Sequence, residues 1–488
     1  MIKLTLTAVA VASLLAACAS GPIQRPDPPE LPAAFAQGQS LEAGMPTQPQ
    51  AGFAFGDPVL EALIQRELGA NLDLQQAAER VQRSRALANG MRAELSPGGS
   101  LGLGARSQQL SRAAAPGANG EDRRGNNASA GAMLSWEIDL FGRLGHAARA
   151  ADARTTAVDA DAAAMRLAVG AEVAQVWFAL NGAREQLRLT RTVVENRRET
   201  VQLVQRRVTA GYTAPLDEAR SRADLAAAEA DAPAHEAALA LAAHRLAVLL
   251  GTSPSTFRAP AASSATPRPV ALNIPEPEQW ARLRPDLKAA EARLQAQALD
   301  VESIRAEFLP RLSVAGVLSF VAGSVSGLGA AGSASWFIAP NVSVPIFDRG
   351  RIDARLQAAQ AGQREALLAY RQQVLLATEE VESALAQVRQ GQLRLAALQD
   401  RARHAASAES LARKRFAAGG TDLLELLDAQ RNAQQAELGL LSEMTAQKQR
   451  LVALQRALGG GFDTTRGAAA SAAHESPASD RAHPPSPT

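Results

Sequence analysis

The chain has 488 residues, of which 47% are hydrophobic but only 4% aromatic, and its formal net charge is +2 at pH 7. Lys and Arg are scattered among Asp and Glu, so no basic segment indicates a nucleic-acid partner. Alanine dominates the apolar residues, which favours helices packed closely along their length over a thick globular core.

Residues 1–17 have the pattern of a secretory signal peptide. Lys3 is its charged start, and the apolar run over 4–15 is too short to span a bilayer as a stable helix. The sequence Leu15-Ala-Ala-Cys18 resembles the lipobox of bacterial lipoproteins, in which cleavage precedes the cysteine and its thiol is acylated. This resemblance implies lipidation at Cys18 and an outer-membrane destination, and the plainer alternative is an unmodified thiol. Because Cys18 is the only cysteine, no disulfide can form within the chain.

The segment after the signal peptide predicts a tether and then two helices. Residues 18–56 are rich in Pro, Ala and Gln and are expected to form a lipid-anchored, extended tether without a core of its own. A short helix is expected to begin at Asp57, which can cap it. A second helix is expected over 71–94, and its counterpart in the second half of the chain over 284–308.

Alternating apolar and polar residues predict strands with one apolar and one polar face in each half of the chain. The apolar face carries Ala130, Ala132, Leu134, Trp136, Ile138 and Leu140 in the first half, and Ala334, Trp336, Ile338, Val342, Val344 and Ile346 in the second. Weaker partner strands and Gly-rich or charged loops complete two hairpins, at about 97–141 and 309–347.

A globular sheet would show the same alternation, but an exported lipoprotein favours a membrane barrel. Four strands cannot close a barrel, and unpaired backbone groups at an open edge cost several kcal/mol each in hydrocarbon. Several chains must therefore complete one barrel. Two, three or four subunits are all compatible with the strand pattern, which does not choose among them.

Two long helices without proline are expected at 142–209 and 350–418. At 1.5 Å per residue the first would extend about 100 Å. Each is expected to end at a glycine and to be followed by a threonine that can cap the returning helix, namely Gly211 and Thr213, then Gly419 and Thr421. The resulting helical hairpins cover 142–251 and 348–459.

The same order of helices, strand hairpin and helical hairpin occurs twice, which indicates duplicated architecture. The predicted organisation is a first repeat at 57–251, a connector at 252–280, a second repeat at 281–460 and a disordered tail at 461–488. Two histidines in this tail, His474 and His483, are not expected to form a metal site.

No motif indicates a catalytic, cofactor or metal site. The segment 327–332 matches the Gly pattern of dinucleotide-binding loops, but a strand pattern containing Pro340 follows it where a helix N-terminus would be required. The other histidines lack ligand spacing, and no Gly-x-Ser-x-Gly elbow or Walker-type loop occurs. We therefore expect no enzyme activity and no cofactor.

Four features resemble the outer membrane efflux proteins, the TolC-like channels, and in particular their lipid-anchored multidrug branch. They are Leu15-Ala-Ala-Cys18, the strand-to-helix junctions at 136–143 and 344–351, and Arg415-Phe-Ala-Ala-Gly419 followed by Leu424-Glu-Leu-Leu-Asp428-Ala-Gln430. The resemblance covers residues from about 57 to 459.

The resemblance implies a mixed α and β membrane protein, in which three chains form a 12-stranded outer-membrane barrel continued by a periplasmic helical barrel. It also implies that the hairpin tips dock on a periplasmic adaptor, which links the channel to an inner-membrane pump of the resistance-nodulation-division type. The matching tip residues are Arg207, Gly211 and Thr213, and Arg415, Gly419 and Thr421. The expected function is passive export of drugs or other small toxic compounds. The alternatives are a duct for type I protein secretion and a lipid-anchored periplasmic scaffold.

The resemblance also implies a closed periplasmic mouth just beyond the second tip. Leu424 and Asp428 match its constriction and lie one helical turn apart. In a trimer Asp428 would recur as a ring that hinders anions, whereas the plainer alternative is a solvated surface carboxylate. The internal repeat makes Arg220 equivalent to Asp428, which predicts an ion pair between helices that helps to hold the mouth closed.

Overall fold

The computed structural model describes residues 31, 33–36, 56–117, 119–261 and 274–459. The predicted signal peptide, Cys18, most of the tether and the C-terminal tail lie outside the described residues. The chain divides into two compact units, and each unit takes segments from both halves of the sequence repeat. The first unit contains 79–160 and 286–373, and the second contains the rest of the described chain.

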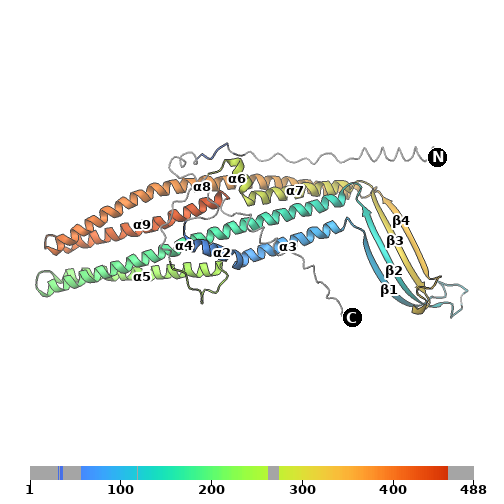
Figure 1. Cartoon of the computed structure of the whole chain (residues 1–488), viewed down its shortest axis with the longest axis horizontal. Helices are drawn as coiled ribbons and strands as arrows, with labels where there is room; N and C mark the ends of the chain where they lie inside the picture. The colour runs from blue at the N-terminus through green and yellow to red at the C-terminus, as the bar shows by residue number, and fades with distance from the viewer. Residues whose placement is uncertain (1–30, 32, 37–55, 118, 262–273, 460–488) are drawn as a thin grey trace, which may run out of the picture. The chain divides into compact units, whose positions relative to one another are not determined.

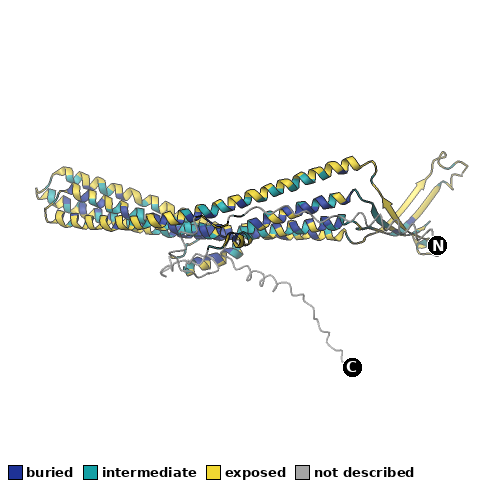
Figure 2. Cartoon of the chain, turned by 90° about the horizontal axis from the view of Figure 1, so that it is seen from above, coloured by how far each residue is buried: buried dark blue, intermediate teal, exposed yellow. Residues whose placement is uncertain are grey.

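The first unit holds a four-stranded antiparallel sheet in the order β1-β2-β3-β4 (Figure 1). Its strands are β1 (Gly98–Gln109), β2 (Arg124–Ile138), β3 (Arg311–Ala322) and β4 (Ala334–Ser343). Each half of the chain supplies one hairpin, and β2 pairs with β3 between the two halves, for example Trp136 with Val314. The outer strands β1 and β4 are exposed throughout (Figure 2).

The pairing confirms that the sheet has one strongly apolar face. Residues directly opposite each other on paired strands share a face. The register places Leu101, Leu103, Ala130, Ala132, Leu134, Trp136, Leu312, Val314, Leu318, Phe320, Trp336, Ile338 and Val342 on the same side. The opposite side carries mainly Gly, Ser, Ala and Asn.

The junction from β2 to the first long helix, α4 (Arg143–Thr209), is held by two carboxylates. Asp139 accepts hydrogen bonds from the backbone N–H groups of Leu144, at 3.1 Å, and Gly145, at 2.7 Å, so it caps the helix N-terminus. Glu137 accepts two hydrogen bonds from the guanidinium of Arg143, at 2.9 and 2.8 Å. The motif at 136–143 is therefore a rigid strand-to-helix connection.

The helices of the first unit pack through small residues. They are most of α3 (Leu72–Ala93), α7 (Pro285–Ala306) and the first parts of α4 and of α8 (Arg349–Ala417). Ala150 and Ala153 of α4 form a buried cluster with Ala296 and Leu299 of α7. The hydroxyl of Ser303 donates to the carbonyl of Arg143 at 2.8 Å. The high alanine content thus serves close helix packing.

The second unit contains α2 (Pro58–Ala70), α5 (Pro215–Leu249), α6 (Pro277–Leu283), α9 (Leu423–Ala457) and the remainders of α4 and α8. Its main apolar core joins α2 to α4 and to the end of α5, with Leu60, Trp177 and Leu246 fully buried. As predicted, Asp57 caps α2, since its carboxylate accepts from Val59 N at 3.0 Å. The same carboxylate accepts from the indole of Trp177 at 2.7 Å, which joins the cap to the core.

One acidic side chain lies inside this core. Glu67, on α2, is 0% exposed, and neither of its carboxylate oxygens has a hydrogen-bond partner among the described residues. Burial disfavours the charged form and raises the pKa of Glu67 to about 8. Glu67 is therefore largely protonated at neutral pH in the folded chain.

Part of the predicted tether, which is expected to have no core of its own, packs against α6 and α8. The ring of Phe35 is 3% exposed and meets the Trp280 ring edge to face, with 5.4 Å between centroids. The backbone N–H of Ala36 donates to Glu382 at 2.6 Å. A single aromatic residue within a Pro-rich, Ala-rich segment gives too weak a periodic signal to predict this contact.

Among the described helices, one is long and apolar enough to cross a membrane by length and composition, and it is α4. Half of the apolar 18-residue stretch of α4 is buried inside the protein, as for a core helix. This burial agrees with the expectation that alanine-rich helices pack closely along their length.

Candidate functional site

The two helical hairpins turn in the same way, at tips formed by α4 and α5 and by α8 and α9 (Figure 1). In the first tip, Tyr212 N donates to Arg207 O at 2.9 Å and Gly211 N donates to Val208 O at 3.0 Å. Gly211 has φ of 76°, and its counterpart Gly419 has φ of 74°. This is a Schellman motif, in which glycine adopts the left-handed conformation and the last helical carbonyls find donors. The predicted helix stops at both glycines are confirmed.

The predicted threonine caps are wrong by one residue. The N-cap of α5 is Ala214, which makes no side-chain cap bond, and the N-cap of α9 is Asp422, which accepts from Glu425 N at 2.9 Å. Thr213 instead donates to the carboxylate of Asp217 at 2.6 Å, and Thr421 likewise donates to Glu425. A hydrogen bond from a hydroxyl to a charged carboxylate is stronger than one between the hydroxyl and a backbone N–H. Each threonine therefore binds a carboxylate of the first turn and stabilises the turn from a position outside the helix.

The arginines of the two tips make different contacts. Arg207 donates to the carbonyls of Phe416, at 2.9 Å, and Ala417, at 3.2 Å, and its guanidinium lies 4.5 Å from the centroid of the Phe416 ring. A cation at these last carbonyls of α8 is also favoured by the helix dipole. Arg415, the equivalent residue, stays in its own tip, with Gly420 O at 3.4 Å and Glu425 at 3.7 Å. Within one chain, Arg207 therefore links the first tip to the second.

The expected gate residues lie within the first two turns of α5 and α9. The Leu424 side chain is 52% exposed, while the neighbouring Leu423, Leu426 and Leu427 are buried in a cluster under the tips. Leu424 lines a groove of about 540 Å³ between α5 and α9, to which Arg220 also contributes.

Within one chain, Arg220 and Asp428 do not form the expected ion pair. Arg220 lies 3.7 Å from Asp217, one turn earlier on its own helix, and Asp428 accepts from Asn432 at 3.1 Å. The ion pair that joins α5 to α9 is formed by Asp224 and Arg431, with 2.8 Å between Arg431 Nε and the carboxylate. A contact between Arg220 and Asp428 of neighbouring chains stays a prediction.

Asp224 belongs to a charge cluster, which we call the tip cluster and which comprises the buried side chains of Arg197, Asp224 and Gln430 and the half-exposed Arg431. Arg197 Nε lies 2.6 Å from Asp224, and Arg197 also donates to the amide oxygen of Gln430. The side chains of Arg197 and Asp224 are only 3% and 7% exposed. Burial, partly offset by the carboxylate of Asp224, lowers the pKa of Arg197. The tip cluster joins α4, α5 and α9 just behind the tips.

Sequence reasoning missed the tip cluster, although the repeat carried a signal for it. Asp224 and Arg197 correspond to Asn432 and Ala405 in the other half, so the charges occur in one copy only. Long helices contain many charged residues, and only the three-dimensional arrangement distinguishes this buried pair from the exposed ones.

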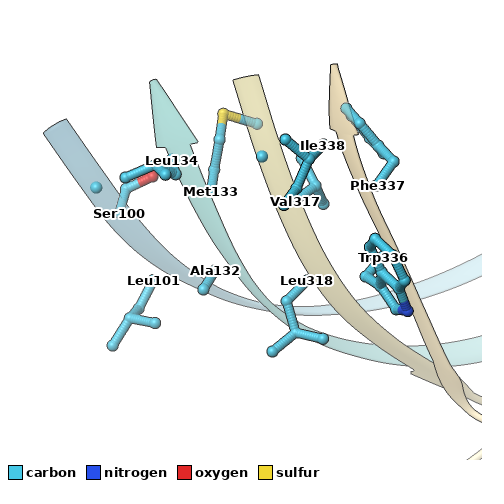
Figure 3. Close-up of a pocket in the computed structure, with 12 residues that line it drawn as sticks. Ser100, Leu101, Ala132, Met133, Leu134, Val317, Leu318, Trp336, Phe337 and Ile338 are labelled. Atoms are coloured by element: carbon cyan, nitrogen blue, oxygen red, sulfur yellow. The ribbon is translucent and has the colours of Figure 1, made fainter. Parts of the chain in front are cut away.

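The sheet is the second candidate site. Leu101 is 88% exposed and Trp336 74% exposed on the apolar face. Exposing such side chains to water is unfavourable by roughly 25 cal/mol per Å², so this face suits hydrocarbon. A hollow of about 490 Å³ lies against the sheet and is lined by 99–101, 132–134, 316–318 and 336–338 (Figure 3).

The described residues contain no group of three or more His, Cys, Asp or Glu side chains that could hold a metal ion. The segment 327–332 lies between a short 3-10 turn, η2 (Val325–Gly327), and the start of β4. As predicted, a strand follows this segment where a dinucleotide-binding loop would lead into a helix N-terminus.

Comparison with known proteins gives consistent matches along most of the chain. Residues 63–252 and 277–460 match the family model described as "Outer membrane efflux protein". Outer membrane protein OprJ of Pseudomonas aeruginosa is 32% identical over 466 residues, which cover 94% of this chain and 96% of OprJ. The "Probable outer membrane lipoprotein SilC" of Salmonella typhimurium is 28% identical over 473 residues, with 95% and 100% covered. The solved outer-membrane channel OprN matches with a TM-score of 0.82 at 33% identity, covering 91% of this chain and 99% of OprN.

Proposed function

Because the chain belongs to the outer membrane efflux protein family, we propose that three copies of it form a passive duct that exports drugs or other small toxic compounds. The chain is the outer-membrane component of a tripartite efflux system, and its family is one of channel proteins. The observation that carries the proposed duct is the four-stranded sheet, which has an exposed apolar face and a face of small and polar residues.

Closure of the sheet requires other chains. In hydrocarbon the free backbone groups of β1 and β4 need partners, and β4 of one chain can pair with β1 of the next. Three chains then form a 12-stranded barrel with its apolar face toward lipid and its small-residue face toward the lumen. Strands of 10 to 15 residues are long enough to span a bilayer at a tilt.

The internal repeat predicts the register between chains. Aligning the starts of β1 and β3, and then the strands paired with them, makes Leu101 equivalent to Val314, and Val344 equivalent to Trp136. Trp136 and Val314 lie opposite each other within the chain. If the two halves alternate around a ring, Val344 lies opposite Leu101 of the neighbouring chain.

The helical hairpins are proposed to continue the duct into the periplasm and to meet the partner proteins at their tips. Three chains would supply twelve helical segments for a second barrel. The adaptor would dock on the tips that contain Gly211 and Gly419, and it would connect the duct to an inner-membrane pump of the resistance-nodulation-division type. The lipid anchor at Cys18, which lies outside the described residues, remains part of the proposal, and SilC is named as a probable lipoprotein.

Leu424 and Asp428 are proposed to form the constriction at the periplasmic mouth. Leu424 is exposed and Asp428 has one contact within its own helix, so both are available to neighbours around the ring. Three carboxylates in close proximity would disfavour anions and attract cations.

Single-channel recording in planar bilayers tests the duct. The purified protein is expected to give discrete, long-lived conductance steps, and Asp428→Asn is expected to raise the current of the closed state and to weaken its cation preference. A periplasmic scaffold would give no conductance, and that result would reject the duct. An Asp428→Asn channel with unchanged current and selectivity would reject the gate alone.

A further inference from the structure

The small-residue face of the sheet has one row that differs from its neighbours. The strand register places Ser100, Met133, Val317 and Phe337 side by side across β1 to β4. The rows on either side consist only of Gly, Ala and Ser, namely Gly98, Ser135, Ala315 and Ala339, and Gly102, Gly131, Ser319 and Ser335. Met133, Val317 and Phe337 therefore form an apolar band, which stands above small neighbours on both sides.

The band is accessible within the chain. Met133 is 58% exposed and Phe337 is 51% exposed, although they lie on the face opposite the exposed Trp336 and Leu101. Figure 3 shows the three side chains of the band on three consecutive strands, at the level of the hollow that lies against the sheet. Glycine and serine in the flanking rows cannot cover the long side chains of Met133 and Phe337.

Among the described residues, no packing contact accounts for the band. The other side of the sheet already supplies the apolar side chains that would face lipid. Met133, Val317 and Phe337 do not belong to the buried core. The nearest charged residues on the same face, Glu137 and Arg106, lie at least two rows away along β2 and β1. An uncharged solute with an apolar or aromatic part is the ligand that such a surface favours, because contact removes apolar area from water on both partners.

We infer that the Met133, Val317 and Phe337 bands of the chains line the lumen of the barrel and form a contact site for apolar and aromatic solutes in transit. This inference rests on the proposed duct. Methionine adapts its shape to different partners and the phenylalanine ring offers a flat face, so the site accepts varied organic molecules without a fixed hydrogen-bonding pattern. Since the row follows the hydrogen-bonding direction across tilted strands, each chain contributes a separate oblique band to the wall.

Reaction of introduced cysteines tests the inference. Val317→Cys lies inside the band, and Ser319→Cys is the matched control, two residues further along the same strand and on the same face. In conducting channels in a planar bilayer, the drop in conductance measures the reaction rate with benzyl methanethiosulfonate, a neutral aromatic reagent, and with a small sulfonated methanethiosulfonate. Unmodified protein, whose only cysteine is Cys18, is the reagent control.

The ratio of the aromatic to the sulfonated reaction rate is expected to be roughly tenfold higher at residue 317 than at residue 319, from contact of the benzyl ring with the band. Adding Phe337→Ser to Val317→Cys is expected to remove most of this difference. Equal ratios at the two positions, or a ratio unchanged by Phe337→Ser, would overturn the inference and leave the duct intact. Absence of conductance from unmodified protein would overturn the duct and the band together.

Discussion

Glu67→Gln is expected to stabilise the protein at neutral pH. The substitution keeps the size and shape of the side chain and removes its ionisation. In the unfolded chain Glu67 has its ordinary pKa of 4.5, and in the folded chain burial raises this pKa to about 8. Between these values the folded state holds a proton that the unfolded state releases, so folding stability falls as pH rises from about 4.5 to about 8.

The size of the effect follows from the two pKa values. Each unit of pKa difference corresponds to about 1.4 kcal/mol, so at pH 7 ionisation of the unfolded state costs the wild-type fold on the order of 3 kcal/mol. Because Gln cannot ionise, the Glu67→Gln variant does not lose this folding free energy at pH 7. Below pH 4 both side chains are neutral, and the difference in stability between Glu67→Gln and wild type is expected to vanish.

Thermal unfolding of the detergent-solubilised protein between pH 4 and pH 8 measures this prediction. The midpoint of Glu67→Gln should exceed that of wild type by several degrees at pH 7 and should match it at pH 4. Glu61→Gln, on the exposed side of the same helix, is the control and should show little pH-dependent difference. Equal midpoints at pH 7, or a benefit that is largest at pH 4, would refute the idea that an uncompensated buried carboxyl lies in this core.

Two further predictions concern the tip cluster and the join between chains. Asp224→Asn leaves Arg197 buried beside an uncharged partner and is expected to destabilise the fold by about 3–5 kcal/mol, measured by denaturant unfolding. Asp231→Asn, on the same helix, is its control. Combining Leu101→Cys with Val344→Cys is expected to give disulfide-linked trimers on non-reducing gels, because the repeat-based register places these residues opposite each other across the join between chains.

Clear results would contradict either prediction. Asp224→Asn with a stability equal to that of Asp231→Asn would mean that Arg197 finds other partners without cost. Monomers only from the Leu101 and Val344 pair, with trimers from Leu101→Cys and Val342→Cys instead, would show a shifted register. Linked dimers without trimers would argue for a two-chain barrel.

Local features of the structure could be predicted from the sequence. The alternation at 128–141 predicts which face of β2 is apolar, and glycines at 211 and 419 predict helix ends, because both depend only on residues close in sequence. The threonine caps were misplaced because a hydroxyl can cap a helix or donate to a nearby carboxylate, and the sequence alone does not rank these two bonds.

Features that depend on contacts distant in sequence were not predictable. Glu67 has an ordinary helical context, and only the packing of α2 against α4 and α5 encloses it. In the sequence, Asp224 is one of many charged residues on long helices. Only the structure shows that Arg197 and Arg431 both lie next to it. The repeat would have marked Asp224 as unmatched in the other half, but not as buried.

The contact of Arg207 with the end of α8 has a consequence for motion. Two hydrogen bonds and the stacking of a guanidinium on Phe416 tie the two hairpin tips of one chain together, whereas the equivalent Arg415 is held within its own tip. Any displacement of one tip is thus transmitted to the other. In the proposed ring of three chains, the six tips would therefore move as three pairs, and the lines of separation would run between chains.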